Sequence, residues 1–379
     1  MADKITESFS IVITIYRFLG LYPTRNQSKL RKIWVYGLYF SQVTTTILLF
    51  VNFVVEGHSD PATTNQMGIF FSEAVASCLK SVPFLRNGHR IKSCINYFGD
   101  PEFETKSNEE KKIVDECVGI CRRNVKIYFV AVLVTVICWS SVPLFQKVRR
   151  LPIDVWLPYD LQNPVLYFLS YTFLLAVGMY LGFVGQMMGP LIGGLAYHAT
   201  CQLKILKHNL RNLIQYSEHY SNAEFESVFG RVKRSIIQHN KILKFISDFE
   251  NCFSFCVFCE LAASMFGLCF SCVGLTMVSL ASMYGVMYII SYVVLAFQIL
   301  FYCHYGTLLF EENEGLITEV YSGFWYKCDA KIQKVLLVVM ERSKKPAILT
   351  AGKVVNLTYG TFIYLLKTSY SMITVMKSR

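Results

Sequence analysis

The chain has 379 residues, of which 53% are hydrophobic and only 17% are charged, and it carries a formal net charge of +11. A soluble domain carries about 25% charged residues, so the composition excludes an ordinary soluble protein and indicates one that crosses a membrane several times. The cations are spread over several segments and form no compact basic face, so the charge does not indicate a nucleic-acid partner.

Seven segments are long and apolar enough to cross a membrane, since a helical span needs about 20 mostly apolar residues. In chain order they are Ile33–Val55, Gln66–Phe84, Lys126–Phe145, Val165–Tyr197, Asn251–Met277, Met283–Tyr305 and Gly352–Met376. None alternates as a membrane β-strand does, so we expect an all-α membrane protein with seven transmembrane helices. The shorter apolar stretch Phe9–Leu21 contains Arg17 and predicts an amphipathic or re-entrant helix, not a cleavable signal peptide.

The distribution of lysine and arginine sets the expected orientation, because cytoplasmic loops carry an excess of these residues. Of the 37 cations, 29 fall in the N-terminal segment 1–32 and in the connections 85–126, 198–250 and 306–351. The segments on the opposite side hold five. We therefore expect the N-terminus in the cytosol and, after seven spans, the C-terminus outside the cell.

Glycines recur every three or four residues along the fourth predicted span. They are Gly178, Gly182, Gly185, Gly189 and Gly193. Such spacing lets helix backbones approach closely. Pro190 should kink this helix near its cytosolic boundary.

In two cytosolic connections, 204–250 and 302–340, apolar residues recur with the periodicity of a helix. These connections are also too apolar to be free linkers. We expect the flanking helices to continue below the membrane as a cytosolic helical anchor, buried by packing between subunits. The aromatic residues assigned to this anchor are Tyr321, Trp325 and Tyr326.

No constellation for catalysis is visible: the sequence has no Ser/His/Asp set, GxSxG, HExxH, P-loop or dinucleotide fingerprint. We expect neither an enzyme nor a cofactor. Cys117-x-x-x-Cys121 and Cys256-x-x-Cys259 have no His or Cys partners at zinc spacing, so no metal site is expected. Glu73 and Glu260 lie inside spans, where an acid indicates either proton or ion coupling, or an interhelical pair or water-filled crevice.

Aromatic and polar side chains gather in the outer halves of the second, third, fourth and sixth predicted spans. They are Phe70, Phe71, Thr135, Trp139, Phe168, Tyr171, Tyr284, Met287 and Tyr288. An aromatic-lined cavity with few polar groups suits a small apolar ligand held by shape and dispersion. The alternative is ordinary helix packing together with the aromatic belt at the membrane interface.

The C-terminal third carries several motifs that together resemble the insect odorant receptor family. They are Glu312-Asn-Glu314, Tyr321 with Trp325-Tyr326, Met340-x-Arg342-Ser343-x-Lys345-Pro346, Leu349-Thr-Ala-Gly352 and Leu365-Leu-Lys-x-x-Tyr370-Ser371. Lys344 departs from the pattern, where Gln is common. The related gustatory receptors carry a Gln-Phe signature that this chain lacks, and its short 198–250 connection resembles a ligand-tuning subunit and not the co-receptor.

The resemblance implies an odorant-gated, non-selective cation channel, a heterotetramer with co-receptor subunits in the plasma membrane of a sensory neuron dendrite. It implies that a small volatile ligand binds among helices two, three, four and six of the bundle in residues 1–200. Residues 201–351 would hold helices five and six and the anchor, and residues 352–379 the pore helix, all within one folded unit. The expected pore and gate residues on one helical face are Leu366, Tyr370, Ile373, Met376 and Lys377. Ile373 is the expected hydrophobic gate.

Two alternatives remain at this stage: a G-protein-coupled-type receptor and a gustatory-receptor-like channel. The first requires the N-terminus outside, against the cation distribution, and the third and seventh spans lack the Asp-Arg-Tyr and Asn-Pro-x-x-Tyr motifs.

The orientation can be tested with epitope tags on the two ends of the chain. A C-terminal tag should stain on intact cells, and an N-terminal tag should stain only after permeabilisation, because the cation-rich segments stay in the cytosol. A co-expressed cytosolic protein controls for membrane integrity. Staining of an N-terminal tag on intact cells would reverse the assignment.

Overall fold

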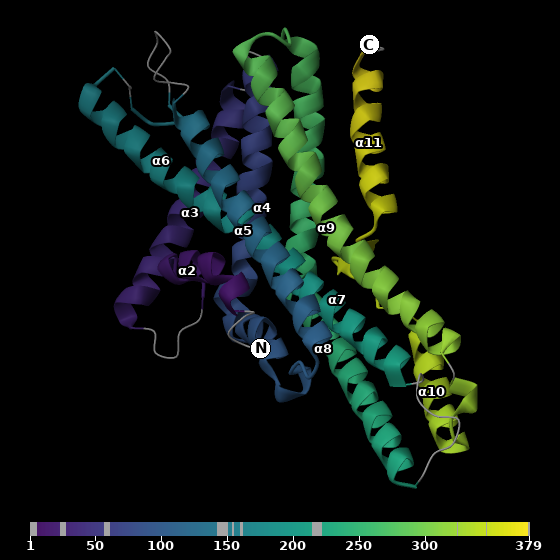
Figure 1. The fold of residues 1–379 in the computed structure, drawn as a ribbon. Helices are drawn as coiled ribbons and strands as arrows, with labels where there is room; N and C mark the ends of the chain where they lie inside the picture. Colours follow the sequence, from purple (N-terminus) through teal and green to yellow (C-terminus); the bar gives the residue numbers. More distant parts are fainter. Residues whose placement is uncertain are drawn as a thin grey trace.

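The computed structural model describes residues 6–22, 28–56, 61–141, 151–153, 155–159, 162–213, 222–323, 325–345 and 347–377. Long helices dominate this part of the chain (Figure 1). They are α2 (Ser10–Phe18), α3 (Lys29–Glu56), α4 (Pro61–Asn96), α5 (Asn108–Ser141), α6 (Pro164–Gln186), α7 (Met188–Leu213), α8 (Asn222–Met277), α9 (Met283–Ser322), α10 (Ala330–Ser343) and α11 (Tyr359–Lys377). Short 3-10 turns follow α4 at Tyr97–Gly99 and Pro101–Phe103, and η4 (Trp325–Lys327) precedes α10.

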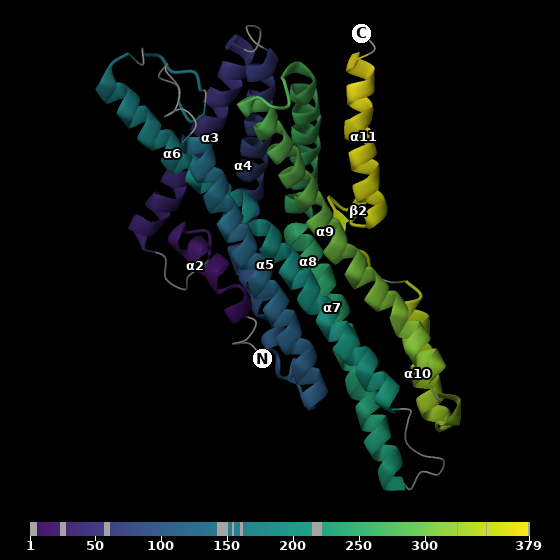
Figure 2. The same cartoon turned by 45° about the horizontal axis from the view of Figure 1, so that its top comes forward.

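The helices alternate in direction between two ends of the molecule, which gives the seven-helix arrangement expected from the sequence (Figure 2). Within the described residues, six helical segments are long and apolar enough to cross a membrane: Lys29–Val55, Thr64–Gly99, Asn108–Ser141, Pro164–Arg211, Val228–Met277 and Gly285–Ser322. The seventh, α11, is shorter and is diluted by Lys367, Thr368 and Ser369. It stands beside α8 and α9 at the edge of the bundle.

The predicted amphipathic segment and the cytosolic extensions are both present. In α2 one face is buried, with Val12, Ile13 and Tyr16 against the bundle. The lower ends of α7, α8 and α9, together with α10, reach beyond α2 and α3 (Figure 1). Where the structure describes connections 204–250 and 302–340, most of their apolar residues lie on helices, and many of them, such as Leu206, Phe245 and Leu316, are buried in the core.

The fourth predicted span is two helices. It breaks at Met187, between α6 and α7, three residues before Pro190. A proline removes the amide that would bond four residues back and crowds that turn, so the predicted kink is confirmed and is sharp enough to end α6.

The seventh helix begins later than expected. The predicted span started at Gly352, but α11 starts at Tyr359, and the intervening residues form a hairpin of β1 (Thr350–Ala351) and β2 (Val355–Asn356). Gly352 and Lys353 have φ of 62° and 60°, a left-handed conformation that ends a helix or makes a turn. Lys353 is therefore a turn residue and does not cross the membrane inside a helix.

The hairpin is fixed to the middle of α8 by hydrogen bonds to the side chains of Glu250 and Ser254. Thr350 donates both its amide and its hydroxyl to Glu250 Oε1, at 2.9 and 2.7 Å. The Ser254 hydroxyl donates to the Thr350 carbonyl at 2.8 Å and accepts from the Lys353 amide at 3.0 Å. A side chain at Gly352 would press on the ring of Phe258. The Leu-Thr-Ala-Gly motif thus positions the base of α11.

The core contains a buried ion pair between the two helices that contact each other most extensively, α4 and α8. Lys80 pairs with Glu260, and both side chains are about 1% exposed. Lys80 Nζ also donates to the Gly185 carbonyl of α6 at 3.3 Å. The interhelical pair was one of the two interpretations of Glu260, and the structure selects it.

We predict that Lys80→Met destabilises the protein by about 3–5 kcal/mol, because it leaves Glu260 as an uncompensated buried charge. The double variant Lys80→Met/Glu260→Met should recover most of the loss, since it removes both charges. The thermal midpoint of the detergent-solubilised chain, followed by size-exclusion fluorescence, measures both. Equal midpoints for the single variant and the wild type would contradict the pairing.

Candidate functional site

A cavity of 230 Å³ lies between the outer halves of α4, α5, α6 and α9, and the segment 151–153 covers it. Its walls are apolar over most of their area. Besides the aromatic residues already named, they include Ile69, Ala74, Val136, Pro152, Ile153, Leu174, Leu175, Leu181, Ile290, Val294 and Leu295. A small adjoining hollow extends the cavity toward the start of α9. This is a concave, mostly apolar site of the kind that binds small molecules.

Five of the residues expected to bind a ligand surround this cavity or its extension. Phe70, Thr135 and Trp139 line the main cavity. The rings of Phe70 and Trp139 meet edge to face with centroids 4.7 Å apart. Met287 and Tyr288 line the adjoining hollow, together with Phe70 and Trp139. The prediction of an aromatic pocket in this region thus has a cavity to support it.

Three of the expected residues lie elsewhere. Phe71 follows Phe70 on α4 and so points about 100° round the helix; it packs on Phe50 and Phe53 of α3. Phe168 is 69% exposed on the outside of α6.

Tyr171 donates to the Ser140 carbonyl and packs beside Tyr167 and not into the cavity. The side chain of Tyr284 lies outside the part of the chain that the structure describes. The aromatic content of the sequence indicates the level along the helices at which the cavity lies. The rotation of each helix decides which of these rings reach the cavity.

Sequence reasoning missed the α6 wall of the cavity, which is made by Gly178, Gly182 and Gly185. These glycines were assigned to helix packing. They do serve close packing, since a Cβ on Gly182 would already touch Val132 and Val136 at 3.5 and 3.6 Å. The same absence of side chains leaves the space that the cavity occupies. The sequence signal that could have indicated this wall is the row of glycines within an otherwise aromatic region.

Among the described residues that line the cavity, Glu73 is the acidic one, and Ser77 and Gln186 line it as well. Among the described residues, its Oε1 is buried without a hydrogen-bond partner. A buried polar atom left unpaired costs about 1–3 kcal/mol, so a ligand hydroxyl or amine that hydrogen-bonds to it would gain affinity. The Lys80–Glu260 pair lies about two turns further along α4.

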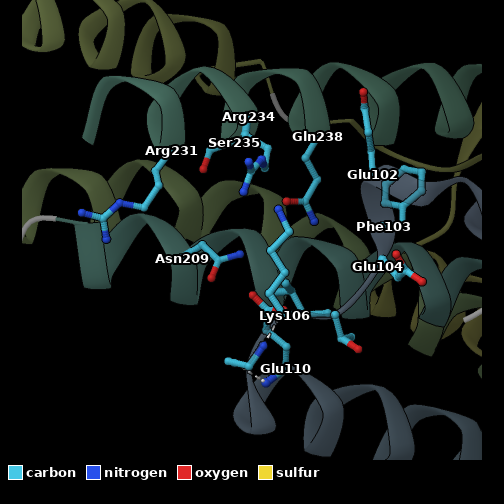
Figure 3. Close-up of a pocket in the computed structure, with 13 residues that line it drawn as sticks. Glu102, Phe103, Glu104, Lys106, Glu110, Asn209, Arg231, Arg234, Ser235 and Gln238 are labelled. Atoms are coloured by element: carbon cyan, nitrogen blue, oxygen red, sulfur yellow. Dashed lines mark hydrogen bonds between the residues drawn. The ribbon is translucent and has the colours of Figure 1, made fainter. Parts of the chain in front are cut away.

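A second cavity, of 360 Å³, lies at the opposite end of the bundle, between the start of α5 and the lower parts of α7 and α8. Its lining is polar and charged, and Lys106 extends across it toward Arg234 and Gln238 (Figure 3). Burial and the neighbouring Arg234 lower the pKa of Lys106. Glu110 accepts from the Lys106 amide there and caps α5. Such a surface suits no apolar ligand, because its polar groups would lose their water.

The described part of α11 turns one face to the bundle and another away from it. Leu365 and Ser369 are buried, whereas Tyr364 and Tyr370 are 67% and 63% exposed. Leu366 packs partly against the core. The side chains of the remaining expected pore residues, Ile373, Met376 and Lys377, lie outside the described side chains.

A comparison with known families and structures agrees with this architecture. The family described as 7tm Odorant receptor matches residues 60–370, so the chain belongs to this family of membrane receptors and is not an enzyme. It is 23% identical over 318 residues to Odorant receptor Or1 of Anopheles gambiae, covering 76% of this chain and 75% of that one. It is 25% identical to Odorant receptor 22c of Drosophila melanogaster, over 58% of each chain.

The fold is also that of a solved receptor of the same kind. The insect olfactory receptor OR5 from Machilis hrabei superposes with a TM-score of 0.84 over 97% of both chains, at 14% identity. The structure of that receptor in complex with eugenol superposes with a TM-score of 0.86 over 100% of this chain and 99% of the other. At this identity the likeness concerns the fold.

We predict that Trp139→Ala shifts the dose–response curve of the best agonist at least tenfold to higher concentration. A ligand held by dispersion loses affinity with the contact area of the indole, and a tenfold shift corresponds to about 1.4 kcal/mol. Phe168→Ala is the matched control, since this ring points away from the cavity and its loss should leave the curve in place. Equal curves for Trp139→Ala and wild type at equal surface expression would exclude Trp139 from the site.

Proposed function

We propose that this chain is the odorant-binding subunit of a heteromeric ligand-gated cation channel. A small volatile ligand in the 230 Å³ cavity opens a non-selective pore that α11 helps to line. The observation that carries the proposal is the apolar cavity lined by Phe70 and Trp139, in which one oxygen of the Glu73 carboxyl is buried without a hydrogen-bond partner among the described residues. It is smaller than the roughly 300–1,000 Å³ of drug-sized sites, as a volatile ligand requires.

The Machilis hrabei receptor of the same fold binds eugenol, a small aromatic molecule with one hydroxyl. The cavity of this chain offers the matching chemistry: apolar walls for a ring and one carboxyl for a hydroxyl. We therefore infer a ligand of this class, with a small apolar body and a single hydrogen-bonding group.

The structure offers a mechanical route from the cavity to α11. Ile290 and Leu295 line the cavity on α9, and the same helix continues to the base of α11. There His304 Nδ1 meets the Tyr359 hydroxyl at 2.6 Å, and the Tyr359 amide donates to the Thr307 hydroxyl at 3.2 Å. A tilt of α9 on ligand binding would therefore move the start of α11. In this mechanism the ligand acts by its differential affinity for the two positions of α9.

The lower extensions of α7 to α10 supply the surface for subunit assembly in this proposal. Tyr321 and Tyr326 are 69% and 58% exposed there, and Val338 of α10 is 68% exposed. Trp325 packs beside Tyr321 with ring centroids 6.5 Å apart. Exposed aromatic groups of this kind are typical of interfaces. We assign them to contacts with co-receptor subunits in a heterotetramer, on the cytosolic side of the plasma membrane.

We predict that Ile373→Ser raises the ligand-free current of cells that express this chain with the co-receptor. A narrow ring of apolar side chains excludes water, and a hydroxyl there lets water remain. The other subunits of the heteromer keep their own gate residues, so the leak should be partial. Whole-cell recording at matched surface expression measures it.

The control is Val375→Ser, which lies roughly on the opposite side of the same helix, at 3.6 residues per turn. It should leave the basal current unchanged. If Ile373→Ser alters neither basal current nor ion permeability, this face of α11 does not line the gate, and the pore assignment is wrong.

A further inference from the structure

Two cysteines of α5 and one histidine of α7 meet in the lower half of the bundle, well away from the odorant cavity. Cys117 and Cys121 are four residues apart and so share one face of α5. His198 approaches them from α7. All three are buried, with exposed fractions of 2%, 2% and 1%. Among the described residues, one ligand atom from each lies within 4.8 Å of both others.

The spacing of these atoms fits a metal ion. Cys117 Sγ lies 3.6 Å from His198 Nδ1. In a tetrahedral zinc site the metal–sulfur and metal–nitrogen bonds of about 2.3 and 2.0–2.1 Å place the two donor atoms roughly 3.5 Å apart. The structure therefore holds this sulfur and this nitrogen at the separation that a shared zinc ion imposes.

The chemistry of the donors favours zinc over harder ions. Thiolate and imidazole are soft to intermediate ligands, which magnesium and calcium avoid. Charge supports the same choice, since two thiolates and a neutral imidazole around Zn²⁺ sum to zero. A neutral assembly is the one that a dry protein interior tolerates, because an uncompensated buried charge is costly.

The surroundings can shield the site. The thiol of Cys201, one turn beyond His198 on α7, interacts with Cys117 and donates to the Ile113 carbonyl at 3.7 Å, so as a neutral thiol it can stand beside the site without changing the charge sum. The ring of Phe9, ahead of α2, meets the His198 ring edge to face with centroids 5.7 Å apart. Phe98 lies on the imidazole at 6.4 Å. These rings keep water away from the three donors.

We propose that Cys117, Cys121 and His198 form a structural zinc site that fastens α5 to α7 beneath the membrane. With the orientation inferred above, these thiols face the reducing cytosol, where zinc binding is favoured over disulfide formation. The sequence expectation of no metal site considered only spacing along the chain. The fold brings His198 to the pair from 81 positions away.

The zinc content of the purified full-length chain tests the proposal. We expect about one zinc per chain by mass spectrometry of the metal, and at least a tenfold fall in Cys117→Ser, Cys121→Ser and His198→Gln. The matched control is Cys138→Ser, which removes an exposed thiol from the same helix and should keep the zinc. Wild-type zinc levels in all three ligand variants would overturn the site.

A second measurement on the wild type does not depend on whether the variants fold. The chain is stripped with a chelator and titrated with Co²⁺, which should give the near-ultraviolet absorption of thiolate-to-cobalt charge transfer. Zn²⁺ should then displace the cobalt and abolish this absorption. A stripped wild-type chain that stays folded by size exclusion and takes up no cobalt would overturn the proposal, as would zinc-free protein prepared in zinc-supplemented medium.

Discussion

The buried pair of Lys80 and Glu260 is the constraint around which the membrane part of this receptor is arranged. Placing one charge on α4 and the other on α8 obliges these two helices to pack in a single rotation and a single register, because any other register would leave a charge alone in the interior. The second contact of Lys80, the carbonyl of Gly185 at 3.3 Å, extends the constraint to α6. A Cβ at Gly185 would lie in ordinary van der Waals contact with the Lys80 ammonium, at 3.6 Å, so α4 and α6 pack closely at this level.

The cavity that we propose to bind the odorant is a consequence of this arrangement. With α4 and α6 held at the level of Lys80, their outer halves diverge around Glu73 and the glycine stripe, and α5 and α9 supply the aromatic wall. The end of the cavity nearest Lys80 is therefore fixed by the ion pair, whereas the residues of its side walls can be substituted. Variation of the side residues would change the ligand without disturbing the pair that stabilises the bundle, which suits a receptor whose relatives share little sequence identity.

A second fixed point lies at the base of α11. Ser254 and Glu250 hold the hairpin on α8, while Thr307 and His304 hold the first residue of α11 on α9. Helix α11 is therefore hydrogen-bonded to α9 at its base, while the described side chains Tyr364 and Tyr370 face away from the bundle. A helix attached in this way can change its inclination while its base stays hydrogen-bonded, as gating by the last helix requires.

The number of membrane helices, the amphipathic α2, the helical extensions beyond the spans, a distortion near Pro190 and the family could all be predicted from the sequence. These follow from hydrophobicity and spacing over consecutive residues, which are local properties of the chain. Only the tertiary structure decides that Phe70 faces the cavity and Phe71 does not. It also decides that Glu260 forms an ion pair with Lys80 and that the Leu-Thr-Ala-Gly motif forms a hairpin. It also decided that His198 meets Cys117 and Cys121. Each of these depends on how one helix is rotated against another, and rotation is set by contacts between residues far apart in the chain, where spacing along the sequence carries no signal.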